Sequence, residues 1–192
     1  DMAEQLPINC TLKTRGTGAG GANTNLTGLS YEEMTDLSSE YMCHKIIDSK
    51  PKTAELLFHA YPQNMFVTTR QAGLFKYMKD AIDTAVDKAH GCKNPDECYI
   101  HIETNTIIII EKKFQQVSGS VCEKIQTADF KRRHYKRSFP GHKIVYIYCL
   151  SDWFKLNCKA ELEYLSEINI PVFWGNSNTY KKDIVEYIVS CI

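Results

Sequence analysis

The run of isoleucines at 107–110 constrains the fold of this chain more than any other feature. Isoleucine and tyrosine dominate the stretch from Tyr99 to Ile110, and a strand buried on both faces is the usual place for such an unbroken apolar run. The polar segment from Glu103 to Thr106 supplies a turn that splits the stretch in two. The sequence therefore predicts a β-hairpin whose second strand lies in the middle of a sheet.

Charged and amide side chains come directly after the isoleucines. Glu111, Lys113 and Gln115 alternate along the strand, so all three share one face. A two-residue turn at Thr104-Asn105 would place Asp96 opposite Lys113 and diagonal to Glu111. Two carboxylates beside a lysine suit Mg²⁺ and a phosphate, because Mg²⁺ binds through one or two carboxylates and keeps waters, one of which can become a nucleophile. A solvated strand end with unrelated charges is the alternative.

Neighbouring segments extend this pattern. Pro95-Asp96 followed by Glu111-Lys-Lys113 resembles the signature of the PD-(D/E)xK superfamily of Mg²⁺-dependent nucleases. Gln115 and the segment from Gly119 to Lys124 are similar to the residues that come after this signature in type II restriction endonucleases of the superfamily. The Gly-rich run from Gly20 into Glu32 resembles the start of their N-terminal helix.

The resemblance implies a role for each matching residue. Asp96 and Glu111 would bind Mg²⁺, together with the backbone carbonyl of Lys112. Lys113 would orient or activate the attacking water and offset charge in the transition state. Gln115 would position the scissile phosphate or hold Lys113.

A further acidic residue is expected near the start of a helix predicted over 31–47. Ser30 can cap this helix, and carboxylates in its first turn are favoured by the helix dipole whatever their function. The resemblance favours Glu32 as an additional acid of the metal site, with Glu33 as the alternative.

The formal net charge of zero over 192 residues means that a phosphate-binding surface must be local. The run from Lys131 to Arg137 contains five cationic residues interleaved with His134 and Tyr135, and predicts a clamp on the DNA backbone, with a solvated loop as the alternative. Ser120 can cap a helix over 121–130 and offer free N–H groups to a phosphate. The candidate DNA contacts are Arg15, Ser120, Lys124, Lys131, Arg132, Arg133, Lys136, Arg137 and Asn176.

The rest of the chain predicts a single α/β domain over 1–192, with 1–29 as a Gly-, Thr- and Asn-rich segment. Helices are expected at 71–89, 152–167 and 180–192, strands at 143–150 and 168–174, and connecting segments at 53–61 and 65–69. Alternating strands and helices after the hairpin predict a restriction-endonuclease-like mixed sheet of at least four strands, flanked by helices on both faces.

Cysteine usage and apolar runs suggest where such a protein works. The eight cysteines are scattered and several lie in apolar patterns, which predicts reduced, buried thiols in a cytoplasmic protein. The polar start and the lack of a long apolar run predict neither a signal peptide nor a membrane span. Gly16 to Gly21 matches the sequence pattern of a dinucleotide-binding loop, but no apolar strand precedes it. We therefore expect no organic cofactor.

These observations together predict a type II restriction endonuclease that cuts double-stranded DNA with Mg²⁺. Cutting both strands of a symmetric site is simplest with two active sites, which predicts a homodimer. Two alternatives remain. One is a repair or recombination nuclease of the same fold that recognises DNA structure instead of sequence, and the other is a non-catalytic DNA-binding module that uses Lys131 to Arg137.

Overall fold

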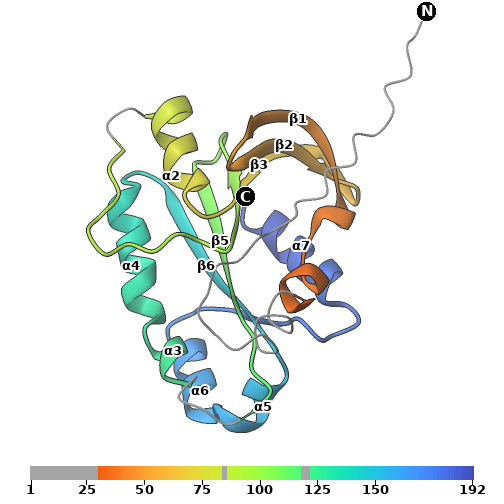
Figure 1. Cartoon of the computed structure of the whole chain (residues 1–192), viewed down its shortest axis with the longest axis vertical. Helices are drawn as coiled ribbons and strands as arrows, with labels where there is room; N and C mark the ends of the chain where they lie inside the picture. Colours follow the sequence, from red (N-terminus) through yellow and green to blue (C-terminus); the bar gives the residue numbers. More distant parts are fainter. Residues whose placement is uncertain (1–29, 84–85, 118–121) are drawn as a thin grey trace, which may run out of the picture.

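The fold is built on one mixed β-sheet of seven strands, as seen in a computed structural model that describes residues 30–83, 86–117 and 122–192 (Figure 1). Each strand lies beside its neighbours in chain order, and the first five pair antiparallel, whereas β5, β6 and β7 run parallel. The predicted α/β class with a mixed sheet is therefore confirmed. The strands are β1 (Tyr41–Ser49), β2 (Lys52–Phe58), β3 (Tyr61–Thr69), β4 (Glu97–His101), β5 (Thr106–Lys113), β6 (Lys143–Leu150) and β7 (Val172–Trp174).

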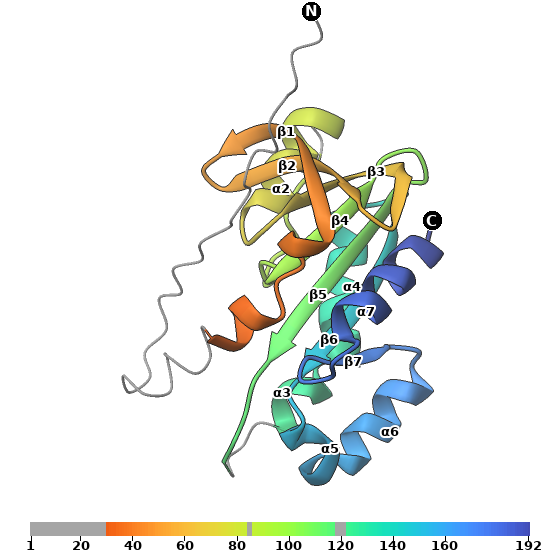
Figure 2. The same cartoon turned by 90° about the vertical axis from the view of Figure 1, so that its right-hand side faces the viewer.

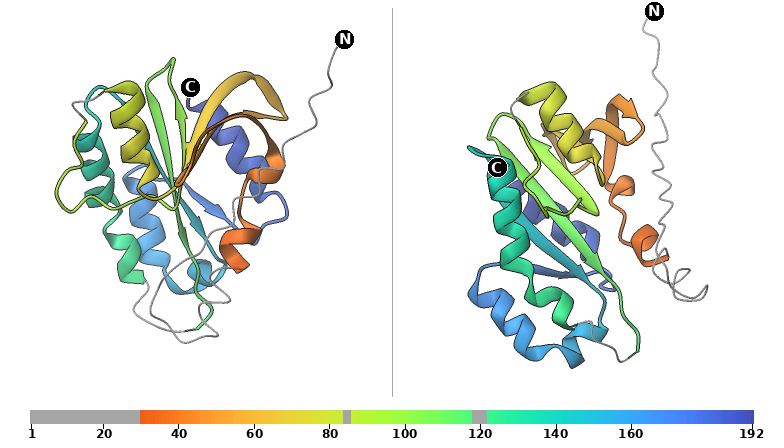
Figure 3. Two further views of the ribbon diagram at one scale, coloured as in Figure 1. Left: turned by 45° about the horizontal axis from the view of Figure 1, so that its top comes forward. Right: turned by 60° about the vertical axis from the view of Figure 1, so that its left-hand side comes forward.

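Helices cover both faces of the sheet (Figures 1 and 3). One face carries most of them, packed over a core that includes Tyr135, Phe154 and Leu165. The other face is covered by α7 (Tyr180–Ser190) and by the curled β1–β3 end of the sheet. The helices of the first face are α2 (Gly73–Tyr77), the π-helical turn η2 (Met78–Ile82), α3 (Cys122–Gln126), α4 (Ala128–Ser138), α5 (Trp153–Asn157) and α6 (Lys159–Glu167).

Strand β5 runs through the middle of the molecule (Figure 2). Ile107 and Ile109 point into the core under α4, whereas Ile108 and Ile110 point into the core under α7, and all four are fully buried. Burying one such side chain contributes about 1.5–3 kcal/mol relative to leaving it exposed. The predicted strand, buried on both faces, is confirmed.

The turn of the β4–β5 hairpin is longer than the sequence predicted. His101 pairs with Thr106, so the turn contains the four residues from Ile102 to Asn105. Asn105 adopts a φ of 50°, a left-handed conformation that asparagine tolerates. The Thr104 hydroxyl lies 2.8 Å from Nδ1 of His101 and 2.9 Å from the hydroxyl of Thr106, which holds the wider turn together.

The longer turn changes the cross-strand register beside the isoleucines. Glu97 pairs with Ile110, and the same register places Asp96 opposite Glu111. The predicted position of Asp96 opposite Lys113 is therefore wrong. The two carboxylates are closer together in the observed register than in the predicted one, because directly opposite residues are nearer than diagonal ones.

The predicted helix over 31–47 is wrong beyond its first turn. Residues 30–34 are helical, the short 3₁₀ helix η1 (Ser38–Glu40) comes next, and β1 takes up the remainder. Leu37 and Tyr41 are buried as a helical stripe would require. The adjacent residues Ile46 and Ile47 are exposed instead, and β-branched side chains of this kind fit an edge strand that pairs with β2.

Several further elements differ from the prediction. The helix predicted over 152–167 is divided into α5 and α6, and the strand predicted over 168–174 is limited to β7. The segments predicted as connections form β2 and β3, whose buried Phe58 and Phe66 pack edge to face. The helix predicted over 71–89 ends at Ile82, so Gly91, with a φ of 79°, lies in a turn and does not cap that helix. The helix predicted to end at Phe130 continues as α4 to Ser138, because lysine and arginine are good helix formers.

Two cysteines contradict the prediction that all are reduced. Cys122 and Cys158 form a disulfide with their Cα atoms 5.6 Å apart, which joins the start of α3 to the junction between α5 and α6. These residues are 36 positions apart, so only the folded chain brings them together. In the described part of the chain, no helix has the length and apolarity needed to cross a bilayer.

Candidate functional site

Three carboxylates lie where the β4–β5 hairpin leaves the sheet, and we call Glu32, Asp96 and Glu111 the carboxylate cluster. The charge of Asp96 acts on the other two, although the oxygen atoms of the three do not all lie within 4.8 Å of one another. Asp96 directly precedes β4, and its Oδ2 accepts a hydrogen bond of 2.9 Å from the backbone N–H of Lys112. Glu111 is only 4 % exposed, and Nζ of Lys113 lies 3.3 Å from its Oε2. The structure therefore brings together the predicted aspartate, glutamate and lysine.

Glu32 joins the cluster from the helical turn at 30–34. Its side chain is half-buried, whereas Glu33 is exposed, so Glu32 is the acid that faces the site. Tyr31 anchors the turn, because its ring lies 5.2 Å from the ring of Phe114 and is buried. The Tyr31 hydroxyl lies against Gly175, where any Cβ atom would overlap it.

Lys131 reaches the site from α4. The lysine is half-buried, and the charges of Glu111 and Asp96 act on its ammonium group. The sequence predicted Lys131 only as a DNA contact and missed its place beside the acids. One signal was available, since Lys131 precedes the buried Tyr135 by one helical turn and so lies on the inner face of α4.

Aromatic side chains form the floor beneath Glu111. Tyr148 is its direct neighbour on β6, and Tyr146 and Tyr135 come next, with ring centroids 5.4 Å and 6.1 Å apart in turn. All three rings are buried, and burial and the charge of Glu111 raise the pKa of each, while Tyr146 lowers the pKa of Tyr148. This floor removes Glu111 from water.

The electrostatics of the cluster result from this burial. Desolvation raises the pKa of Glu111 and the nearby charge of Asp96 raises it further, while Lys113 and Lys131 oppose the shift. Desolvation and Asp96 likewise raise the pKa of Glu32. Burial lowers the pKa of Lys131, against the attraction of Glu111. Carboxylates that repel one another in a poorly hydrated place are stabilised by a bound cation.

Lys112 points to the opposite face of the sheet from its neighbours. Its Nζ lies 2.8 Å from Oε2 of Glu97, and both side chains are almost completely buried. The hydroxyl of Tyr99 donates to the other oxygen of Glu97. The backbone N–H of Lys112 faces Asp96, and the charge of its buried ammonium group also acts on Glu32.

Gln115 lies just beyond the end of β5. Its side-chain amide donates a hydrogen bond of 2.6 Å to the carbonyl of Val117, so this amide is bonded within its own loop instead of to Lys113. Its backbone is fixed by the hydroxyl of Ser151, which accepts from the Gln115 N–H at 3.0 Å and donates to its carbonyl at 3.1 Å.

The cationic run lies within α4 and is divided among its faces instead of forming one clamp. Arg132 points to the protein, where it donates to the carbonyl of Ile168 at 2.9 Å and to Asp129 at 2.8 Å. Arg133 is exposed and also pairs with Asp129. Lys136 and Arg137 are exposed on the outer side of the helix, as a contact with DNA phosphates requires.

The other predicted DNA contacts lie apart from this run. Lys124 is exposed in the last turn of α3. Oδ1 of Asn176 accepts a hydrogen bond of 3.0 Å from the backbone of Asp152, which gives this side chain a role in holding its own loop. Arg15 and Ser120 lie outside the described residues.

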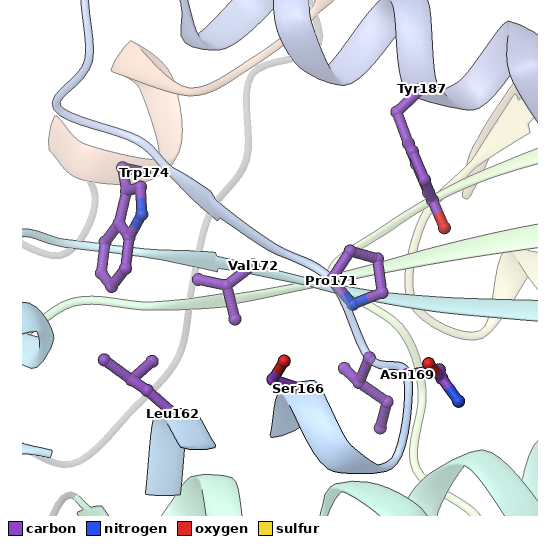
Figure 4. A pocket seen from close by; sticks show the side chains of 8 residues that line it. Leu162, Ser166, Asn169, Pro171, Val172, Trp174 and Tyr187 are labelled. Carbon is purple, nitrogen blue, oxygen red and sulfur yellow. The ribbon is translucent and has the colours of Figure 1, made fainter. Parts of the chain in front are cut away.

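Two other features are candidate sites of a different kind. Cys122, Cys158 and Glu161 bring their ligand atoms within 4.8 Å of one another, but the two sulfur atoms are bonded together and are not thiolates. A groove of about 460 Å³ runs along β7 between α6 and α7, where Trp174 and Tyr187 line it (Figure 4). None of its lining residues belongs to the carboxylate cluster.

The donors of the carboxylate cluster are all oxygen atoms, which suits a hard cation such as Mg²⁺ better than a softer metal. Two of the three carboxylates belong to the hairpin, and the third comes from a turn that is distant in sequence, so the cluster is a product of the whole fold. The chain matches no protein-family model, no curated protein and no solved structure.

Proposed function

We propose that this protein is a Mg²⁺-dependent deoxyribonuclease of the PD-(D/E)xK type, with a restriction-endonuclease-like fold. One observation carries the proposal: the β4–β5 hairpin places Asp96 opposite Glu111, with Lys113 beside them on the same face. The repulsion between the two acids supports a cation between them, because desolvation and Asp96 together raise the pKa of Glu111.

Each residue of the site has a defined task in this proposal. Asp96, Glu111 and the carbonyl of Lys112 would hold Mg²⁺, which when bound supplies Lewis-acid polarisation of the phosphate and a more acidic water. Lys113 orients the attacking water and stabilises the charge that develops on the phosphate. Glu32 adds a third carboxylate, and the charge of Asp96 acts on it. Glu32 would support the bound Mg²⁺ or help to hold a second Mg²⁺.

The substrate of the proposed enzyme is double-stranded DNA, cut at a short sequence in the manner of a type II restriction endonuclease. The exposed Lys136 and Arg137 would contact backbone phosphates, which fix the position of a protein on the duplex without reading its sequence. Two copies of the chain would cut the two strands, so we propose a homodimer.

A structure-specific nuclease of the same fold is the second candidate. It is favoured by the exposed ring of Phe130 among the cations of α4, because an unpaired base can stack on such a ring and a paired base cannot. A non-catalytic DNA-binding module is the third candidate.

Plasmid DNA incubated with the protein and Mg²⁺ tests the proposal. Wild-type protein should give discrete fragments, and the variants Asp96→Asn, Glu111→Gln and Lys113→Ala should each lose cleavage by about 10²-fold or more, since each removes a group that acts in the transition state. Sequencing the fragment ends defines the recognition site. Cleavage of branched substrates without discrete plasmid fragments supports the second candidate.

Glu103→Gln is the matched control, because Glu103 is an exposed acid in the turn at the other end of the same hairpin. It should cut at the wild-type rate. If Lys113→Ala or Glu111→Gln also keeps that rate, the activity comes from another site and the proposal is wrong. DNA retention without any metal-dependent nicking in the wild-type protein points to the third candidate.

A further inference from the structure

The outer side of α4 carries an exposed aromatic ring. Phe130 is 62 % exposed, and it lines a groove together with Arg133, Lys136 and Arg137. The ring of His134 lies one turn further on, with the two centroids 4.2 Å apart. The pair forms a partly polar aromatic platform, with the two rings inclined at 45°. Tyr135, which follows His134 in the cationic run, is fully buried and cannot stack on a base.

Two grooves adjoin this platform, and both include Phe130 and His134. The outer groove, of about 320 Å³, is also lined by Arg133, Lys136 and Arg137. The inner groove, of about 180 Å³, is lined by Gly91, Lys93, Thr127 and Lys131 as well. We call the two grooves together the track. Cations line it on both sides of the Phe130 ring, which the two grooves share. In a chain with a formal net charge of zero, this concentration of positive charge is local.

The inner groove reaches the carboxylate cluster through Lys131. This lysine lines the groove, and at the same time the charges of Glu111, Lys113 and Asp96 act on its ammonium group. Lys131 therefore connects the inner groove to the carboxylate cluster through its charge, although no carboxylate of the cluster lines the inner groove, the outer groove or the groove along β7.

We infer that the track along α4 binds a single-stranded nucleic acid next to the carboxylate cluster. Cations alone would suit any polyanion, including duplex DNA. A ring exposed between cations favours a single strand, because only an unstacked base presents a face to it, and base–aromatic stacking combined with a charged groove is how proteins hold single strands. The inference rests on the second candidate function, the structure-specific nuclease, and deepens it, since it names an unpaired segment as part of the substrate.

Binding in the absence of divalent metal tests the inference apart from catalysis. Fluorescence anisotropy with EDTA would follow labelled oligo(dT), oligo(U) and a blunt DNA duplex. Phe130→Ala should weaken single-strand binding by about 5- to 150-fold, the effect of losing one stacked base, and leave duplex binding unchanged. Leu156→Ala is the matched control, because Leu156 is 88 % exposed on α5 and lines neither groove.

The cations provide an independent readout. The double variant Lys136→Gln/Arg137→Gln should reduce the slope of log affinity against log salt concentration by about 1.4, since each phosphate contact on a single strand contributes about 0.7. Lys181→Gln/Lys182→Gln on α7 removes the same charge elsewhere and should keep the wild-type slope. A preference for oligo(dT) or for oligo(U) identifies the strand as DNA or RNA, and either supports the inference.

The inference is overturned if Phe130→Ala binds oligo(dT) and oligo(U) as tightly as the wild-type protein. It is also overturned if Leu156→Ala loses as much affinity for the single strands as Phe130→Ala does, or if Phe130→Ala loses affinity for the duplex to the same extent. The proposed function fails separately, when the wild-type protein binds single strands through Phe130 but cuts nothing with Mg²⁺. Thermal melting of each variant confirms that an exposed substitution has left the fold intact.

Discussion

At the scale of the residue, Glu111 shows how a side chain placed for the proposed function can lower the stability of the fold. Its carboxylate is buried over a floor of tyrosine rings and faces Asp96, so folding raises its pKa. A carboxyl group whose pKa is raised by folding adds stability below its unfolded pKa of about 4.3, and that stability is lost as the pH rises through the folded value. At neutral pH and without metal, ionised Glu111 therefore destabilises the fold.

Glu111→Gln should accordingly increase the free energy of unfolding at pH 8 in EDTA by about 0.5–2 kcal/mol, the usual gain when a costly functional group is removed. At pH 4, where the wild-type carboxyl group is largely protonated, the difference should shrink toward zero. Urea denaturation at the two pH values measures both.

Magnesium provides the complementary test. Added Mg²⁺ should stabilise the wild-type protein, because a ligand that binds only the folded state shifts the unfolding equilibrium, and should have little effect on Glu111→Gln. A Glu111→Gln variant that is less stable than wild type at pH 8 would show that the carboxylate is well compensated without metal.

At the scale of the element, strand β5 serves two purposes through its alternating faces. Glu111 and Lys113 face α4 and the carboxylate cluster, while Lys112 between them points to the other side and pairs with Glu97. The buried pair crosses from β5 to β4, so it fixes the two strands against each other near the register that places Asp96 opposite Glu111.

Breaking this pair should be costly. Lys112→Met leaves the buried Glu97 carboxylate without its cation and should lower the free energy of unfolding by about 3–5 kcal/mol. The double variant Glu97→Met/Lys112→Met should recover most of the loss, since an apolar pair of similar volume carries no unpaired charge. Chemical denaturation of the wild type, Lys112→Met, Glu97→Met and the double variant gives the coupling energy. Additive effects of the two single changes would mean that the ion pair contributes nothing specific.

The hairpin was predictable because its signals are local. Four isoleucines, a polar turn and the charged residues after them lie within one short segment, and the two strands lie where the pattern indicated. The register was wrong because it depends on a turn in which Thr104 and Asn105 allow either two or four residues. The predicted acids lie on the same face all the same, because a register shift of two residues keeps each side chain on the same face of the sheet.

Other features depend on contacts that no local pattern contains. The segment from Tyr41 to Ser49 has apolar residues compatible with a helix or a strand, and its pairing with β2 decides the outcome. Lys131 was predicted as part of a surface cluster, and only the packing of α4 on the sheet turns it toward Glu111. The Cys122–Cys158 bond likewise requires α3 and α5 to meet.

At the scale of the whole molecule, the carboxylate cluster of one chain would cut one strand of DNA. A symmetric double-strand cut then needs a second copy, and the mass in solution tests this part of the proposal. Light scattering after gel filtration should give about twice the chain mass of 22.0 kDa, with dissociation on dilution. A single copy of the chain bound to duplex that has been cut on both strands would rule the homodimer out.

The packing of Tyr31 on Gly175 has a consequence for the order in which the molecule is made. Tyr31 holds the turn that carries Glu32, and its hydroxyl rests on a glycine that comes after the last strand of the sheet. A ribosome would release the hairpin acids long before this glycine emerges. The third acid therefore gains its support only after the chain has been made as far as Gly175, so a shorter nascent chain holds an incomplete cluster.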